Sequence, residues 1–342
     1  MRARSQGPFR RVLRWARLGL VAVSLLVTLG LAVSRWMASR RETQVAASAA
    51  PTGGRFVPAG DVQMFVQEMG DPAAPAVLFV HGTGAWSETW RPAMAAVAGA
   101  GFRAIAVDLP PFGYSQRPQP PRYAKEDQGR RIVAALDGLG VQRVILVGHS
   151  FGGGPTTEAA LLRPERVEAL VLVDAALSIR DPAVPDSRPP AVARLGLATR
   201  PFRDAMVATF FSNPRFTRRL LQSFIADPAV ATPERVAVYQ RPLTLQGTTR
   251  AFGEWLPELL APAAPSRSED PAAYATLGLP LAIIWGDRDT ITPLEQGRRL
   301  AALAPGATLD VLPGVGHIPQ IEDPRAFNDL LVKVLRRVRP AG

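Results

Sequence analysis

The hydrophobic pattern changes at residue 61, where short apolar runs begin to alternate with stretches of helical periodicity. The segment VQMFVQEMG (62–70) alternates apolar and polar positions, as a half-exposed strand does. Continuous apolar runs follow at AVLFVHG (76–82), FRAIAVDLP (102–110), RVILVGHS (143–150), VEALVLVDAA (167–176), LPLAIIWGD (279–287) and ATLDVLPG (307–314). Helical stretches lie at 91–100, 125–138 and 325–338. Because continuous runs suit parallel strands buried on both faces, residues 58–176 and 273–342 are predicted to form an α/β domain with a mostly parallel sheet between helices.

The alternation breaks between residues 177 and 272. This segment is rich in Pro and Arg, and amphipathic helices are predicted at 201–211, 214–225, 233–240 and 248–260. It carries too many aromatic side chains to remain solvated, namely Phe202, Phe210, Phe211, Phe216, Phe224, Phe252 and Trp255. We expect a helical cap, inserted after the sixth strand, over the carboxyl ends of the strands, where such sheets bind ligands.

Residues 18–34 form a run of 17 residues without a charged side chain. As a helix this run spans about 26 Å at ~1.5 Å per residue, close to the hydrocarbon thickness of a bilayer. Arg17 and Arg35 close the run, and Trp15 and Trp36 lie just outside it, as side chains at membrane interfaces do. We expect residues 1–41 to be a retained signal-anchor, followed by a linker at 42–57. A cleaved signal peptide and a buried core helix are the alternatives.

The formal charge of +11 is concentrated at the N-terminal end. Residues 1–41 contain nine arginines and no acidic residue, whereas the other 301 residues hold 31 basic and 29 acidic side chains. Six arginines precede the apolar run and three follow it, which predicts a cytoplasmic N-terminus and a periplasmic or otherwise extracytoplasmic globular domain. The balanced charge of that domain argues against nucleic-acid binding. The absence of cysteine excludes disulfides and thiolate catalysis.

A G-H-S-F-G sequence at 148–152 follows a predicted strand directly and precedes a predicted helix. A sharp turn of this kind lifts the central serine out of the sheet, and it needs small residues two positions before and after. Gly148 and Gly152 meet that need, so Ser150 is the predicted nucleophile, in a strained backbone conformation. The alternative is a glycine-rich turn with an incidental serine, which the preceding strand disfavours.

A nucleophilic serine needs a base, and the chain has three histidines. His149 adjoins the serine and must point away from it, and His81 begins the segment HGTG after an earlier strand. His317 lies in LPGVGHIPQIEDP, on a loop after the last strand, and is the predicted base.

The acid that orients this histidine has three candidates. Asp287 and Asp289 both follow the apolar run 279–286, and Asp174 follows the run 167–173. The carboxyl ends of parallel strands meet at one edge of the sheet, so all three can reach the same place. Periodicity and composition do not separate them.

These motifs together resemble the α/β-hydrolase fold superfamily, in its capped type with a Ser-Asp-His triad. The segments that carry the resemblance are HGTGAW, DLPPFGYS, GHSFGG, RPERV, GDRDTITP and GHIPQIEDP. The resemblance covers residues 58–342 apart from the cap and implies an eight-stranded, mostly parallel sheet without metal or organic cofactor. Its G-x-x-D register, followed by a loop proline, selects Asp289 as the triad acid. One departure is Pro111, which stands in DLPPFGYS where glycine is common.

The resemblance also implies an oxyanion hole made of the backbone N–H groups of Thr83 and Phe151. We expect a substrate pocket that includes Trp86, Phe151, Tyr239 and Trp255. The predicted activity is hydrolysis of a carboxylic ester of a small to medium apolar substrate through an acyl-enzyme. Carbon–carbon bond hydrolases, thioesterases, acyltransferases and cofactor-free haloperoxidases use the same triad and remain alternatives. A ligand-binding receptor with little turnover is an alternative of another class.

Overall fold

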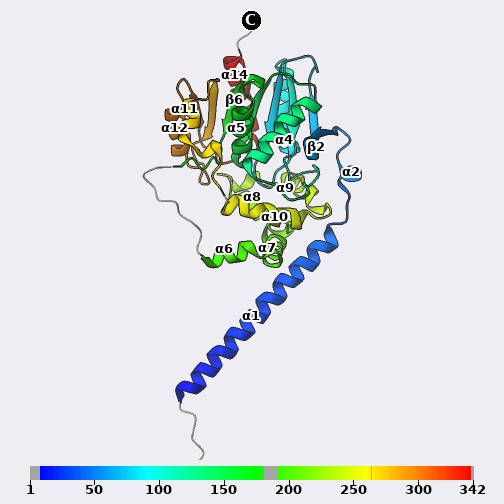
Figure 1. The fold of residues 1–342 in the computed structure, drawn as a ribbon, viewed down its shortest axis with the longest axis vertical. Helices are drawn as coiled ribbons and strands as arrows, with labels where there is room; N and C mark the ends of the chain where they lie inside the picture. The colour runs from blue at the N-terminus through cyan, green and yellow to red at the C-terminus, as the bar shows by residue number, and fades with distance from the viewer. Residues whose placement is uncertain (1–7, 181–190, 263, 340–342) are drawn as a thin grey trace, which may run out of the picture.

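The computed structural model describes residues 8–180, 191–262 and 264–339. At its centre is an eight-stranded sheet with the strand order β1-β2-β4-β3-β5-β6-β7-β8 (Figure 1). The strands are β1 Gly54–Ala59, β2 Val62–Met69, β3 Ala76–Val80, β4 Arg103–Val107, β5 Val144–His149, β6 Val167–Val173, β7 Leu281–Gly286 and β8 Thr308–Leu312. Strand β2 runs antiparallel to both of its neighbours, and β3 to β8 are parallel. The predicted α/β-hydrolase architecture, with a mostly parallel eight-stranded sheet, is therefore confirmed.

Helices cover both faces of this sheet. Leu78 and Val80 of β3 point into a core shared with α4 and α5, while Val77 and Phe79 point into a second core shared with α3 and α14. The α-helices of the α/β body are α3 Arg91–Gly99, α4 Lys125–Gly138, α5 Gly153–Leu162, α12 Leu294–Leu303, α13 Pro319–Glu322 and α14 Pro324–Val338. Burial on both sides explains why the parallel strands have no polar alternation.

The segment between β6 and β7 forms a layer of helices at one end of the sheet (Figure 1). Its helices are α6 Ala191–Ala198, α7 Arg200–Met206, α8 Pro214–Gln222, α9 Pro233–Gln240 and α10 Thr248–Leu260, with α11 Pro271–Ala275 just before β7. A π-helical turn η4, Val207–Phe211, continues α7. Helices α8, α9 and α10 begin at the predicted residues; α8 and α9 start with Pro after a polar cap residue. Residues 181–190 and 263 of the predicted cap lie outside the described ranges.

Residues 42–57 differ from the predicted linker. They contain α2, Ala46–Ala49, and the first four residues of β1, whose Phe56 pairs with Phe65 of β2. Gln44 forms an isolated bridge with Leu245 of the cap. The strand was not recognised because Gly54 and Pro58 weaken its apolar pattern, and Pro is tolerated in an edge strand such as β1.

The N-terminal apolar run forms part of one long helix, α1, Pro8–Arg41. Among the described helices it alone is long and apolar enough to cross a membrane, a test that a signal sequence also passes. Figure 1 shows it projecting from the capped end of the molecule, with only its C-terminal part beside the cap. That part packs against α7 and η4, and Ala38 is buried there.

Candidate active site

Ser150 lies at the turn between β5 and α5, in a left-handed backbone conformation. Its φ of 51° lies in the left-handed region, which costs energy for a residue with a side chain. A Cβ at Gly148 would lie 2.6 Å from Thr156 Oγ1, and one at Gly152 would lie 2.5 Å from the His81 carbonyl oxygen. Both positions therefore require glycine, and the strain predicted for the serine is present.

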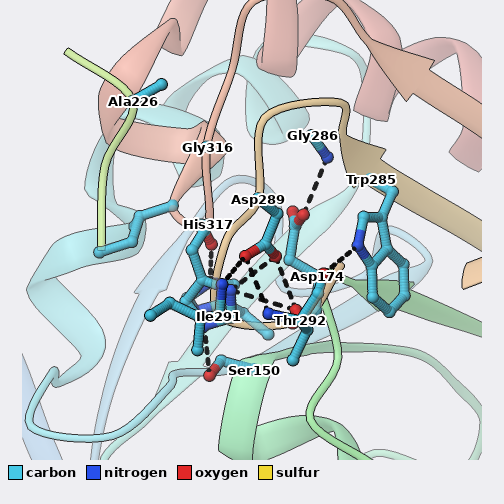
Figure 2. Close-up of polar contacts among 12 residues, drawn as sticks. Ser150, Asp174, Ala226, Trp285, Gly286, Asp289, Ile291, Thr292, Gly316 and His317 are labelled. Carbon is cyan, nitrogen blue, oxygen red and sulfur yellow. Dashed lines mark hydrogen bonds and ion pairs between the residues drawn. The ribbon is translucent and has the colours of Figure 1, made fainter. Parts of the chain in front are cut away.

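Hydrogen bonds join Ser150, His317 and Asp289 in one line (Figure 2). The distance from Ser150 Oγ to His317 Nε2 is 2.8 Å, and His317 Nδ1 lies 2.7 Å from Asp289 Oδ2. The carboxylate accepts from Nδ1–H, so Nε2 is left to accept the serine proton. The structure thus brings together the three residues that the sequence predicts as nucleophile, base and acid. His317 is almost fully buried.

Thr292 is a further member of this group that sequence reasoning missed. Its hydroxyl donates to Asp289 Oδ2 at 2.6 Å, and the backbone N–H groups of Ile291 and Thr292 donate to Oδ1 (Figure 2). Burial raises the pKa of the Asp289 carboxyl, but the hydrogen bonds and charge of His317, together with Thr292, outweigh it and the net pKa lies below its usual value. The D-x-x-T spacing, which favours local side-chain-to-backbone bonds, was the available signal.

The other two histidines are held in structural roles. His81 donates from Nδ1 to the Gly82 carbonyl oxygen, while its Nε2 accepts from the Leu109 N–H at 2.9 Å. His149 donates from Nε2 to the His317 carbonyl oxygen at 2.7 Å. Burial lowers the pKa of His81 to about 4 and that of His149 to about 3, so both are neutral near pH 7.

The competing aspartates do not contact the histidine. Asp287 Oδ1 accepts from the Gly314 N–H at 2.6 Å and so braces the turn after β8. Asp174 is completely buried, and its Oδ1 accepts from the Gly286 N–H at 2.8 Å (Figure 2). Burial raises the pKa of Asp174 well above its usual value, and the charge of Asp289 adds to that shift. Asp174 is therefore more readily protonated than Asp289.

Glu322 is the second residue that the sequence did not single out. Its carboxylate accepts from the N–H groups of Gly316 and Ile318, on either side of His317, at 2.9 and 3.0 Å. It also accepts from the Ala226 N–H of the cap at 2.7 Å. One carboxylate thus fixes the histidine loop and ties it to the cap, since charged acceptors make strong bonds to backbone N–H groups.

The predicted oxyanion donors lie on either side of the serine. A Cβ at Gly82 would lie 3.0 Å from Ser150 Cβ, so the loop that carries Thr83 packs directly against the nucleophile. Within the described residues the Thr83 N–H donates to no protein acceptor. Phe151 is the second residue of the short helix that begins at Ser150, where N–H groups have no intrahelical partner. The assignment of these two N–H groups to an oxyanion hole stays a prediction.

A cavity of about 110 Å³ opens over this group. The described residues that line it are Gly82, Thr83, Gly84, Ala85, Phe112, His149, Ser150, Phe211, Thr217, Leu220, Leu221, Phe224, Tyr239, Leu243, Phe252, Trp255, His317, Ile318 and Gln320. None of these is Asp, Glu, Lys or Arg. The cavity is therefore suited to an uncharged, largely apolar group.

Two of the predicted pocket residues line this cavity and two do not. Tyr239 and Trp255 contribute to its wall. The centre of the Phe151 ring lies 5.3 Å from that of Trp255. Trp86 is fully buried and donates from Nε1 to the Val238 carbonyl oxygen. Trp86 and Phe151 are not among the described lining residues, so their place in the substrate pocket stays a prediction.

No group of three or more His, Asp or Glu side chains in the described ranges is arranged to hold a metal ion. The chemistry available at the site is that of a serine hydroxyl, an imidazole, a carboxylate and two backbone donors. Sheet, nucleophile turn and hydrogen-bonded triad together define a hydrolase of the α/β class.

The chain belongs to the α/β hydrolase fold family, whose model matches residues 75–324. A 2-hydroxy-6-oxo-2,4-heptadienoate hydrolase of Pseudomonas putida is 30% identical over 293 residues, 81% of this chain and 96% of that protein. The 2-hydroxy-6-oxo-6-phenylhexa-2,4-dienoate hydrolase structure from Rhodococcus sp. strain RHA1 is 26% identical, with a TM-score of 0.67 over 83% of this chain and 98% of that one.

A third similar protein is a membrane phospholipase A, described as a bacterial virulence factor, whose crystal structure has a TM-score of 0.64 and 22% identity. At that identity the likeness shows the fold alone. The superposition covers 97% of this chain and 99% of the other. The uncovered part of this chain is shorter than α1, so the superposition includes at least part of that helix.

Proposed function

We propose that this hydrolase cleaves carboxylic esters of uncharged, apolar acyl groups through an acyl-enzyme. The observation that carries the proposal is the cavity over Ser150, whose described lining is largely apolar and holds no Asp, Glu, Lys or Arg. Burial of an acyl chain against such a wall is favourable, whereas burial of an unpaired charge there costs several kcal/mol.

The chemistry follows from the hydrogen bonds. His317 Nε2 accepts the Ser150 proton while Oγ attacks the acyl carbon, and the negative charge that forms on the carbonyl oxygen is held by the Thr83 and Phe151 N–H groups. Asp289 stabilises the imidazolium through its bond to Nδ1. His317 then gives the proton to the leaving alcohol. Water, activated by the same imidazole, releases the acid and restores the serine.

Carbon–carbon bond hydrolysis is the second candidate, and the names of two relatives favour it. A dienoate carries a carboxylate, and a largely apolar cavity without a cation leaves that charge without an ion-pair partner. The described lining offers neither a lysine nor an arginine. This difference supports an uncharged acyl group over the anionic substrates named for the relatives.

A substrate series tests this choice. We expect kcat/KM for p-nitrophenyl hexanoate to exceed that for the matched ester with a terminal carboxylate by at least about 100-fold, because the cavity leaves the carboxylate unpaired. The two substrates share leaving group and chain length, so the ratio reports the charge alone. Preference for the carboxylate, or faster cleavage of a 2-hydroxy-6-oxo-dienoate, would instead support carbon–carbon bond hydrolysis.

We further propose that α1 is retained as a single-pass anchor, with the N-terminus in the cytoplasm and the catalytic domain on the far side. The C-terminal end of α1 is bound to the cap by side-chain contacts. Arg35 pairs with the buried Asp204 of α7 at 2.5 Å, and Arg41 donates to the Ser212 carbonyl oxygen at 2.9 Å. Glu42 accepts from the Thr249 N–H at 3.0 Å. Cleavage after these residues would remove Arg35 and leave Asp204 with Arg200 alone, at 3.6 Å.

Arg35→Gln is therefore expected to destabilise the full-length protein by about 1–3 kcal/mol, since it removes the direct hydrogen-bond partner of a buried carboxylate. The measurement is thermal unfolding in detergent micelles. Arg40→Gln is the matched control, because Arg40 is exposed and forms no ion pair among the described residues. Equal unfolding temperatures for the two variants would show that the docking of α1 contributes nothing.

A further inference from the structure

Large apolar side chains are exposed on helices of the cap that contact one another. Six of them form what we term the cap face: Leu195, Phe202, Phe210, Phe211, Leu259 and Leu260. Outside α1, the other exposed large apolar side chains of the described residues are Val45, Leu162, Ile291 and Val311, on separate elements. Exposed aromatic and aliphatic side chains gathered on neighbouring helices mark an interaction surface.

The cap face lies at the level where the apolar run of α1 ends. Arg35, which closes that run, pairs with Asp204 in the middle of α7, and α1 packs against both α7 and η4. Figure 1 shows α7 beside the C-terminal part of α1, with α6 next to α7, at the end of the molecule opposite α14. A bilayer that holds residues 18–34 must therefore reach α7, because the apolar run is about as long as the hydrocarbon core is thick.

The cap face is also continuous with the cavity over Ser150. Phe211 is 38% exposed, and it lines the cavity together with Leu220 and Phe224. These three residues join the outer apolar surface to the inner one without a charged side chain between them. An acyl chain that leaves the bilayer at η4 would thus stay in contact with apolar atoms as it approaches the serine.

Charge on a neighbouring helix supports the same partner. Arg215, Arg218 and Arg219 of α8 are exposed and form no ion pair within the described residues. Unpaired cations beside an apolar surface are attracted to anionic lipid headgroups. A second copy of the chain is a less favourable partner, because it would bring three more arginines to the same place.

We propose that the cap face is seated in the bilayer that holds α1, and that the substrate is a lipid ester whose acyl chain passes Phe211 to reach Ser150. The substrate part of this inference rests on the proposed ester hydrolysis; the seating does not. The membrane is then both the support of the enzyme and the source of its substrate.

Seating is tested without any activity measurement. The chain has no cysteine, so Phe202→Cys and Phe210→Cys each give a single spin-label site, and Arg336→Cys on α14 gives a matched site at the other end. In full-length protein in phosphatidylglycerol–phosphatidylethanolamine nanodiscs, labels at 202 and 210 are expected to be accessible to oxygen and shielded from a water-soluble nickel complex. The label at 336 is expected to show the reverse. Water accessibility at both 202 and 210 would overturn the proposal, as would spin–spin broadening that assigns the face to a second copy.

Lipid access is tested with the double variant Phe202→Ser/Phe210→Ser, neither of whose residues lines the cavity. We expect hydrolysis of vesicle-embedded phosphatidylglycerol to fall by at least about ten-fold, while turnover of p-nitrophenyl butyrate in detergent stays within about two-fold of wild type. Leu162→Ser/Val311→Ser is the matched control, because these side chains have similar exposure on the α/β body.

The outcomes separate the two proposals. A wild-type protein that cleaves neither ester contradicts the proposed function and leaves the seating to the spin labels. Cleavage of the soluble ester alone, or an unchanged lipid rate in the double variant, overturns the lipid route while ester hydrolysis stands. Equal losses on both substrates would show damage to the fold and would also count against the lipid route.

Discussion

Ser150→Ala is expected to lower kcat for ester hydrolysis by about 10⁶-fold, because no other group replaces the nucleophile and the remaining members of a triad then contribute little. The folded state should be retained. Alanine keeps the same backbone at 150, and the variant loses only the hydroxyl bonded to His317 Nε2. The measurements are steady-state turnover of a p-nitrophenyl ester and thermal unfolding of the same preparation.

A fluorophosphonate probe gives this experiment a second readout. Wild type should be labelled covalently, Ser150→Ala should not, and Ser48→Ala, which removes an exposed hydroxyl of α2, should match wild type. A folded Ser150→Ala protein that still turns over ester or accepts the probe would refute the assignment of the nucleophile. A wild-type protein that resists the probe would favour the receptor alternative.

Asp289→Asn is expected to lower kcat by about 10⁴-fold with little change in the fold. The carboxylate that accepts from His317 Nδ1–H would become an amide, which can donate instead and so favours the tautomer with the proton on Nε2. That tautomer cannot accept the serine proton. Turnover of a soluble ester at neutral pH measures the effect.

Asp287→Asn is the matched control and should change kcat by no more than a few-fold. Its carboxylate accepts from the Gly314 N–H and makes no contact with His317, and an asparagine oxygen can accept the same bond. The two substitutions, Asp287→Asn and Asp289→Asn, are the same chemical change two positions apart on one loop. The reverse ranking of the two variants would overturn the assignment of the acid.

Much of the fold followed from the sequence because the buried strands are continuous apolar runs and several helices begin at recognisable signals. Helix α4 occupies the predicted residues, and α9 begins at Pro233 after the capping Thr232. Strand β1 was missed because an edge strand is only half buried and its Pro58 argues against a strand. Periodicity reports burial, so it is weakest where burial is partial.

The candidate site could be predicted where elimination was possible. Only three histidines exist, and the chain position of two of them excludes the role of base, which left His317. The choice of Asp289 came from a family register, since Asp287 and Asp174 follow strands equally well. Thr292 and Glu322 were missed because their partners are backbone N–H groups that only the folded chain brings near.

Two side chains have partners that the sequence did not indicate, because the direction of a side chain is set by its neighbours. Trp86 follows the HGTG segment closely, yet its indole is turned toward the Val238 carbonyl. Arg35 was interpreted as a side chain that extends toward lipid headgroups, whereas its guanidinium is bound to Asp204. Neither partner is close in sequence, so no local pattern reports it.

The Glu322 carboxylate has a consequence for the order of events in a catalytic cycle. It is shared between Ala226 in the cap and the two residues that flank His317, and the His317 N–H itself donates to the Phe224 carbonyl oxygen at 3.0 Å. A movement of residues 224–226 away from the sheet would break these bonds and release the loop that aims the imidazole. Substrate entry that displaces these residues and cleavage of the bound substrate would then occur at different times. These shared bonds couple the position of residues 224–226 to the alignment of the base, so a change that displaces one would also displace the other.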